Sequence, residues 1–140
     1  MMVVFSYTMD GKEYLVLNAS EKGSFLPQAA GVRLLADRHQ GVGADRVLVF
    51  TGTKEEPSLL VYTPEGEEVA PSQSDYKILV RYLAEAQIAA NPAEIAHAFG
   101  DQAFVKAYEG ALVSRVEFRV TESFLSRLRE ADREAERLVG

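Results

Sequence analysis

Hydrophobic and polar residues alternate at the start of the chain, and this alternation predicts a β-hairpin. The alternation runs on both sides of Asp10-Gly11, a dipeptide that favours a tight turn between two antiparallel strands. We therefore expect strands over residues 3–8 and 13–18.

A short helix and three strands are predicted next. Pro27 is acceptable in a first helical turn, and the glycines Gly41 and Gly43 end the helical pattern. The apolar residues between them fall on one helical face: Ala29, Val32, Leu35 and Ala36. Residues 46–50, RVLVF, form a continuous apolar run that is typical of a buried strand. After a turn at 54–58, we expect strands at 59–63 and 67–71.

A longer amphipathic helix is predicted over residues 74–89. Its apolar residues form one stripe that would face a core: Ile78, Leu79, Tyr82, Leu83 and Ala86. A loop and a short helix beginning near Pro92 follow, and then two strands about Glu109-Gly110. The pattern so far indicates an α+β fold with about seven strands.

The C-terminal residues 122–140 predict a second substantial helix, with Ser123 as its N-cap. Apolar residues recur every four and three positions, as in the seam of a coiled coil: Phe124, Leu128, Ala131, Ala135 and Leu138. The helix would therefore pack against another helix, either on its own domain or on a partner subunit. We take its charged residues as a solvated face.

Composition narrows the class of protein. A chain of 140 residues with 47% hydrophobic and 26% charged residues is suited to a single folded domain. The chain has no cysteine and only two histidines, His39 and His97, which leaves little for a metal site. A net charge of −6 disfavours nucleic acid as a partner. Neither a membrane-spanning run nor a secretion signal is evident, so we expect a cytoplasmic protein with no membrane partner.

The stretch SQSD, Ser72 to Asp75, has the spacing of a capping box at the start of the 74–89 helix. In that interpretation the Ser72 hydroxyl accepts a hydrogen bond from the Asp75 N–H, and the Asp75 carboxylate accepts one from the Ser72 N–H. Two alternatives remain open: Ser72 contacts a ligand, or Ser74 caps the helix.

Three stretches resemble the diaminopimelate epimerase family. LLADRHQGVGADRVLVF (34–50) is similar to that family's helix, Gly-x-Gly-x-Asp loop and buried strand. VYTPEGEEVAPSQSDYKILVRYL (61–83) resembles its strand, turn and helix opening, and MDGKEYLVLN (9–18) resembles its first hairpin. The resemblance covers roughly residues 3–90. It implies a rolled antiparallel β-sheet around a central helix, here followed by the C-terminal helix.

The resemblance also implies an activity. Members of the family are cofactor-independent isomerases with two pseudo-symmetric domains. Each domain supplies one cysteine to move the α-proton of an amino acid held in the cleft between them. The first cysteine opens the central helix within Cys-Gly-Asn-Gly, where backbone N–H groups and the helix dipole hold the substrate carboxylate.

This chain departs from the family at the positions that hold the substrate. Ser72 stands in place of the cysteine, and residues 73–75 replace Gly-Asn-Gly, with Asp75 adding a negative charge where a carboxylate should bind. Serine is much less acidic than cysteine, although some dehydratase relatives of proline racemase carry threonine there. The ligand-binding candidates that the resemblance implies are Lys12, Arg46, Thr63, Ser72, Gln73 and Ser74. If the protein is an enzyme, Ser72 is the candidate for proton transfer, with Asp75 as a second candidate beside it.

Three functions follow. Residues 1–121 would form an epimerase-like half domain, and residues 122–140 would form its terminal helix. In the first function, this domain lacks cysteine catalysis and acts as a non-catalytic module that binds an amino-acid-like small molecule or a protein. Two copies would pair through the cleft face or the C-terminal helix. Alternatively, the homodimer is an isomerase or lyase that uses Ser72, or the chain pairs with a full-length enzyme as a structural partner.

Overall fold

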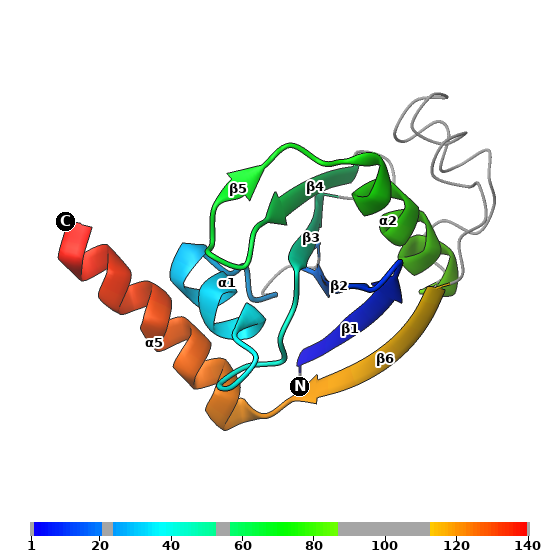
Figure 1. The fold of residues 1–140 in the computed structure, drawn as a ribbon. Coiled ribbons are helices and arrows are strands. Elements are labelled where there is room, and N and C mark those ends of the chain that lie inside the picture. Colours follow the sequence, from blue (N-terminus) through cyan, green and yellow to red (C-terminus); the bar gives the residue numbers. More distant parts are fainter. Residues whose placement is uncertain (1, 21–23, 53–56, 87–112, 140) are drawn as a thin grey trace.

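The computed structural model describes residues 2–20, 24–52, 57–86 and 113–139 (Figure 1). The elements are β1 (Met2–Met9), β2 (Lys12–Asn18), α1 (Ala29–Ala36), β3 (Arg46–Gly52), β4 (Pro57–Tyr62), β5 (Glu68–Val69), α2 (Gln73–Glu85), β6 (Val113–Val120) and α5 (Glu122–Val139). The predicted short helix near Pro92, the strand before Glu109-Gly110 and most of the turn at 54–58 lie outside the described residues.

The strands form one sheet in the order β5-β4-β3-β2-β1-β6. Every neighbouring pair is antiparallel except β2 and β3, which run parallel. The α+β class is confirmed, but the sheet is mixed where we expected antiparallel pairing throughout. The reason is the connection from β2 to β3, which passes through α1 and so returns the chain in the same direction.

The first hairpin confirms the prediction made from Asp10-Gly11. Both residues have positive φ, 53° and 77°, and the closing pair of the hairpin is Met9 with Lys12. Positive φ at both central positions is the requirement of the turn type that matches strand twist. Asp10 and Gly11 therefore fix the register of β1 on β2.

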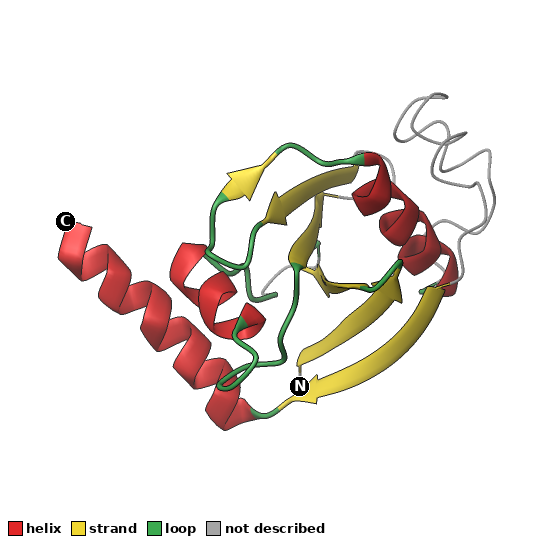
Figure 2. Ribbon diagram, viewed as in Figure 1, coloured by secondary structure: helices red, strands yellow, loops and turns green. Residues whose placement is uncertain are grey.

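Buried side chains form two separate cores, one on each face of the sheet. Figure 2 shows α2 on one side of the strands and α1 with α5 on the other. One face packs on α2, and the core there draws residues from all six strands, including Tyr7, Leu48 and Val61. The other face packs on α1 and α5. The buried residues of this second core include Leu15, Val49 and Leu128. The alternation of side chains along each strand is what divides the residues between the two cores.

The helix α2 is the predicted amphipathic helix, and it begins at Gln73 with Ser72 as its N-cap. Its buried residues include the predicted stripe members Ile78, Leu79, Tyr82 and Leu83. The alternative cap at Ser74 is wrong, because Ser74 already lies within the first turn.

The helix α5 begins at Glu122, and its N-cap is Thr121, two residues before the predicted cap at Ser123. The Thr121 hydroxyl accepts a hydrogen bond from the Phe124 N–H at 3.2 Å. Thr121 is the first residue after β6, so it is placed to cap as soon as the strand ends. Among the described residues, no helix is long and apolar enough to cross a membrane.

Candidate functional site

The start of α2 is organised by the capping box that the sequence predicts. The Ser72 Oγ accepts from the Asp75 N–H at 3.3 Å, and the Asp75 Oδ2 accepts from the Ser72 N–H at 2.8 Å. The Ser72 hydroxyl also donates to the Asp75 Oδ2 at 3.0 Å. The first two contacts satisfy backbone N–H groups that a helix start otherwise leaves without a partner. The prediction of a cap at Ser72 is confirmed.

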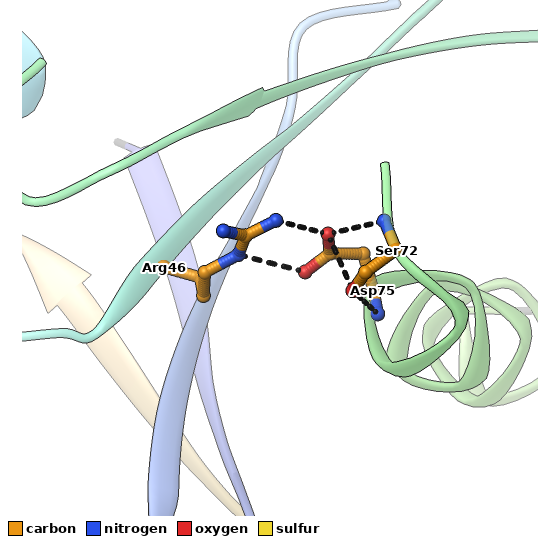
Figure 3. Close-up of polar contacts among 3 residues, drawn as sticks. All are labelled: Arg46, Ser72 and Asp75. Carbon is orange, nitrogen blue, oxygen red and sulfur yellow. Dashed lines mark hydrogen bonds and ion pairs between the residues drawn. The ribbon is translucent and has the colours of Figure 1, made fainter. Parts of the chain in front are cut away.

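The Asp75 carboxylate receives a second set of hydrogen bonds from Arg46, the first residue of β3. Arg46 Nε donates to Oδ1 at 3.2 Å and Nη2 donates to Oδ2 at 2.5 Å, so the pair is bidentate (Figure 3). The Asp75 side chain is fully buried and that of Arg46 is 25% exposed. The hydrogen bonds to Asp75 raise the pKa of Arg46. A buried carboxylate needs such a partner to remain ionised.

Tyr14 and Ser74 adjoin this ion pair. Tyr14 in β2 lies opposite Arg46 in the parallel β2–β3 ladder. Burial raises the pKa of Tyr14, and a hydrogen bond with the Ser74 side chain opposes that rise. Ser74 is half-buried and Gln73 is exposed. The structure thus brings together Arg46, Ser72, Ser74 and Asp75.

Two predicted candidates are placed elsewhere. The Thr63 hydroxyl accepts from the Glu67 N–H at 3.2 Å and closes the turn between β4 and β5. Lys12 is exposed at the start of β2. Among the described residues, no hydrogen bond or ion pair joins Lys12 or Thr63 to the Arg46–Asp75 pair.

The glycine-containing loop before β3 serves the fold. A Cβ on Gly41 would collide with the carbonyl oxygen of Leu34, and Gly43 has a φ of +88°. Asp45 at the end of this loop accepts from the Glu13 N–H at 2.8 Å. These contacts tie the loop to α1 and β2, as expected for turn glycines.

The segment that follows α1 is polar. The Asp37 carboxylate accepts from the N–H groups of His39 and Gln40 at 2.8 Å each. Those two hydrogen bonds lower the pKa of Asp37. The described part of the chain holds no group of three or more metal-ligating side chains.

A second buried carboxylate, Asp132 in α5, was missed by sequence reasoning. Its Oδ1 accepts from the Gly31 N–H at 2.6 Å, and its Oδ2 accepts from the Gln28 N–H at 3.0 Å. These N–H groups belong to the start of α1, whose own N-cap residue makes no side-chain cap. Asp132 therefore caps α1 from another helix. Its partners lie 101 and 104 residues away along the chain, so no local signal marks it.

Two open grooves border α5. One of about 460 Å³ runs between α1 and α5 and is lined by Arg33, Asp37, Arg127 and Glu130 among others. The other, of about 390 Å³, lies beside the loop that precedes α1, next to Asp132. Neither groove includes any of the six ligand-binding candidates.

The structure is an α+β domain whose sheet packs on α2. The N–H groups of Ser72 and Asp75 at the start of α2 are hydrogen-bonded by the protein's own side chains. No protein-family model matches the chain. A curated protein to which it is similar is diaminopimelate epimerase 2 of Nostoc sp., with 29% identity over 85 residues. That alignment covers 59% of this chain and 29% of the Nostoc protein, so the chain spans less than a third of that relative. This similarity suggests a related family and is compatible with the observed fold.

Proposed function

We propose that this chain is a diaminopimelate epimerase-like domain that binds a small molecule or a protein and carries out no proton transfer. The observation that carries the proposal is the Asp75 carboxylate at the start of α2, held by Arg46 and by the Ser72 N–H. In the family that the sequence resembles, a substrate carboxylate is expected at the corresponding helix start. Here the protein's own carboxylate takes that place.

The chemistry at Ser72 points the same way. A proton acceptor at this position must lose its own proton readily, and a thiol has a pKa near 8.5 in model peptides, far below that of an aliphatic hydroxyl. The Ser72 hydroxyl needs a free base beside it, but the Asp75 carboxylate next to it is committed to two hydrogen bonds from Arg46. We therefore expect Ser72 to act as a cap without taking part in proton transfer.

Proton exchange at the α-carbon is the direct test. The protein is incubated in deuterium oxide with amino acids and diamino acids, including diaminopimelate, and loss of the α-proton signal is followed by NMR. We expect no exchange above the rate in buffer. Exchange by the wild-type protein that disappears in Ser72→Asn would contradict the proposal and favour the isomerase or lyase alternative. Asparagine is the matched substitution because it retains good N-cap preference without a hydroxyl.

Binding is tested separately by thermal shift. The panel contains amino acids, diamino acids and dicarboxylates, since these share the chemistry of the resemblance. Ligand at 100 times its dissociation constant stabilises a folded protein by about 2.7 kcal/mol, which raises the midpoint by several degrees. A shift confined to one chemical class supports small-molecule binding. Absence of any shift favours the protein-interaction branch, including pairing with a longer epimerase-like protein.

A further inference from the structure

The strand β6 forms one edge of the sheet among the described strands, where it pairs with β1 (Figures 1 and 2). Six consecutive residues of β6, 114–119, are exposed. The strand has eight residues and no proline. A long exposed edge strand presents unpaired backbone N–H and C=O groups, and proteins usually protect such edges.

The exposed side chains of β6 differ between its two faces. Val116 is 54% exposed and Phe118 is 39% exposed, and they lie on the face that α1 and α5 cover elsewhere, since Phe118 lies opposite Val4 of that core. Glu117 and Arg119 lie on the face of α2, and neither has an ion-pair partner among the described residues. Arg115 on this face is already paired with Glu85 at 3.0 Å.

This alternation makes the edge complementary to itself. Two antiparallel copies of one strand, related by a two-fold axis normal to the sheet, place residues of the same face opposite each other. With the axis at Phe118, Glu117 of each copy lies opposite Arg119 of the other, and Val116 lies opposite Val120. Phe118 then meets Phe118 of the second copy. Each exposed apolar residue gains an apolar neighbour and each free charge gains an opposite charge.

Other registers fit less well. With the axis at Glu117, the two Glu117 carboxylates oppose each other, and Arg115 opposes Arg119. Like charges directly opposite each other destabilise a strand pair. With the axis at Val116, the Glu117 carboxylate opposes Arg115, which Glu85 already neutralises, and Arg119 has no acid opposite it.

We propose that a second copy of this chain pairs antiparallel with β6 about a two-fold axis at Phe118, so that the two sheets join into one. The occupant is a second copy because the strand's exposed charges and apolar residues complement themselves in this register. The surface differs from the cleft face and the C-terminal helix considered from the sequence. The inference does not depend on the proposed function.

Charge reversal tests both the interface and its register. Glu117→Arg and Arg119→Glu each turn two attractive cross-strand pairs into repulsive ones, so each is expected to raise the dimer dissociation constant at least about tenfold. The double variant Glu117→Arg/Arg119→Glu restores opposite charges and is expected to recover the wild-type dimer. Sedimentation equilibrium over a wide concentration range measures the constants, and circular dichroism confirms that each variant is folded.

Apolar substitutions supply an independent readout with a matched control. Phe118→Lys is expected to abolish the dimer, whereas Leu138→Lys, at an 89% exposed position in α5, is expected to leave it unchanged. Hydrogen exchange of the amides of residues 116–120 should slow as protein concentration rises. A monomeric wild-type protein at every concentration would overturn the proposal. So would a dimer that Arg119→Glu leaves intact, or one that Leu138→Lys dissociates.

Discussion

Asp75 is a fully buried carboxylate whose charge is balanced by Arg46, 29 residues away along the chain. Taking both charges out of water is costly, and the bidentate geometry offsets that cost only while both partners are present. Compared with the epimerase pattern one position at a time, Asp75 looks like an unfavourable change and Arg46 looks like a ligand-binding residue. Together they form one structural unit that also anchors β3 to the start of α2.

We expect Arg46→Met to destabilise the protein by about 2 kcal/mol or more, because it leaves the Asp75 charge buried without its partner. The penalty is reduced from that of a fully buried pair because Arg46 is 25% exposed. Adding Asp75→Asn removes the stranded charge and should restore part of the lost stability. Urea unfolding of the two single variants and the double variant measures this coupling.

The matched control for this cycle is Arg38→Met. Arg38 also contacts two carboxylates, those of Glu13 and Asp45, but its side chain is 51% exposed. Exposed ion pairs add little to stability, so a much smaller effect is expected than for Arg46→Met. Equal effects at the two arginines, or a double variant less stable than Arg46→Met, would contradict the proposed role of the pair.

Tyr7 in β1 is fully buried, and its hydroxyl makes no hydrogen bond to any residue that the structure describes. Burial raises its pKa from 10.0 to about 12, Glu85 adds to the rise, and the nearby Arg115 guanidinium opposes it without reaching hydrogen-bond geometry. The unfolded chain therefore loses the Tyr7 proton at lower pH than the folded protein. The stability contributed by Tyr7 is complete below pH 10 and is lost as pH rises towards 12.

We expect Tyr7→Phe to be at least as stable as the wild-type protein at neutral pH, because it removes a buried hydroxyl with no hydrogen-bond partner in the described part of the chain. Its advantage should grow between pH 10 and 12, by up to about 2 kcal/mol, since phenylalanine does not ionise. Urea unfolding at a series of pH values compares the two proteins. A constant difference across that range would show that Tyr7 ionises alike in both states.

At the residue scale, the sequence was sufficient for contacts that are local. The Ser72 capping box and the Asp10-Gly11 turn follow from spacing within a few residues, and both are confirmed. The Arg46–Asp75 ion pair joins residues from a strand and a helix, so it depends on the fold and no local pattern contains it. The candidate site could be located from the sequence, but how its charges are satisfied could not.

At the element scale, α1 and α5 depend on each other. Asp132 in the middle of α5 is the cap that α1 lacks, and the helix dipole adds to the favourable placement of a carboxylate there. Gly31 is the residue that allows this approach. A Cβ at Gly31 would lie 2.7 Å from the Asp132 Oδ2.

We expect Asp132→Ala to cost about 2 kcal/mol, because the N–H groups of Gln28 and Gly31 lose their acceptor. Hydrogen exchange at the start of α1 should accelerate in this variant. Glu134→Ala, at an exposed position of the same helix, is the matched control and should change neither property. If Asp132→Ala has wild-type stability and unchanged hydrogen exchange at the start of α1, the cap contributes nothing to the free energy of unfolding.

Gly31→Ala gives a second test of the same contact. Alanine is favoured over glycine in a helix by about 1 kcal/mol, so the substitution should stabilise α1 if space allows. In the wild-type background the clash with Asp132 should make it destabilising. In the Asp132→Ala background its effect should change sign, which thermal unfolding would reveal.

The apolar residues that α5 buries were predicted in part from the heptad spacing. Leu128 is fully buried as the seam requires, but the other buried members of α5 are Leu125 and Asp132, and the predicted Leu138 is 89% exposed. The physical reason is length. The eight residues of α1 span about 12 Å and the eighteen of α5 about 27 Å, so the C-terminal turns of α5 extend beyond α1 (Figure 1). A heptad pattern does not show how long the partner helix is.

At the scale of the whole molecule, α5 contributes to one of the two cores. Leu125 and Leu128 belong to the same cluster as Val4, Val32 and other residues of the sheet and α1. Removal of the helix would expose this cluster and leave α1 without its cap. Residues 1–121 are therefore expected to need α5 in order to fold, even though the resemblance to the epimerase family ends near residue 90.

A variant ending at Thr121 tests this dependence. We expect it to lose cooperative thermal unfolding by circular dichroism and to bind a hydrophobic dye, because a contiguous apolar surface becomes exposed. A variant ending at Arg137 is the control, since it removes the exposed Leu138 and keeps Asp132 and the buried leucines. It should unfold as the wild-type protein does. Cooperative unfolding of the shorter variant at the wild-type midpoint would instead make residues 1–121 a domain that folds alone and leave α5 free to serve a partner.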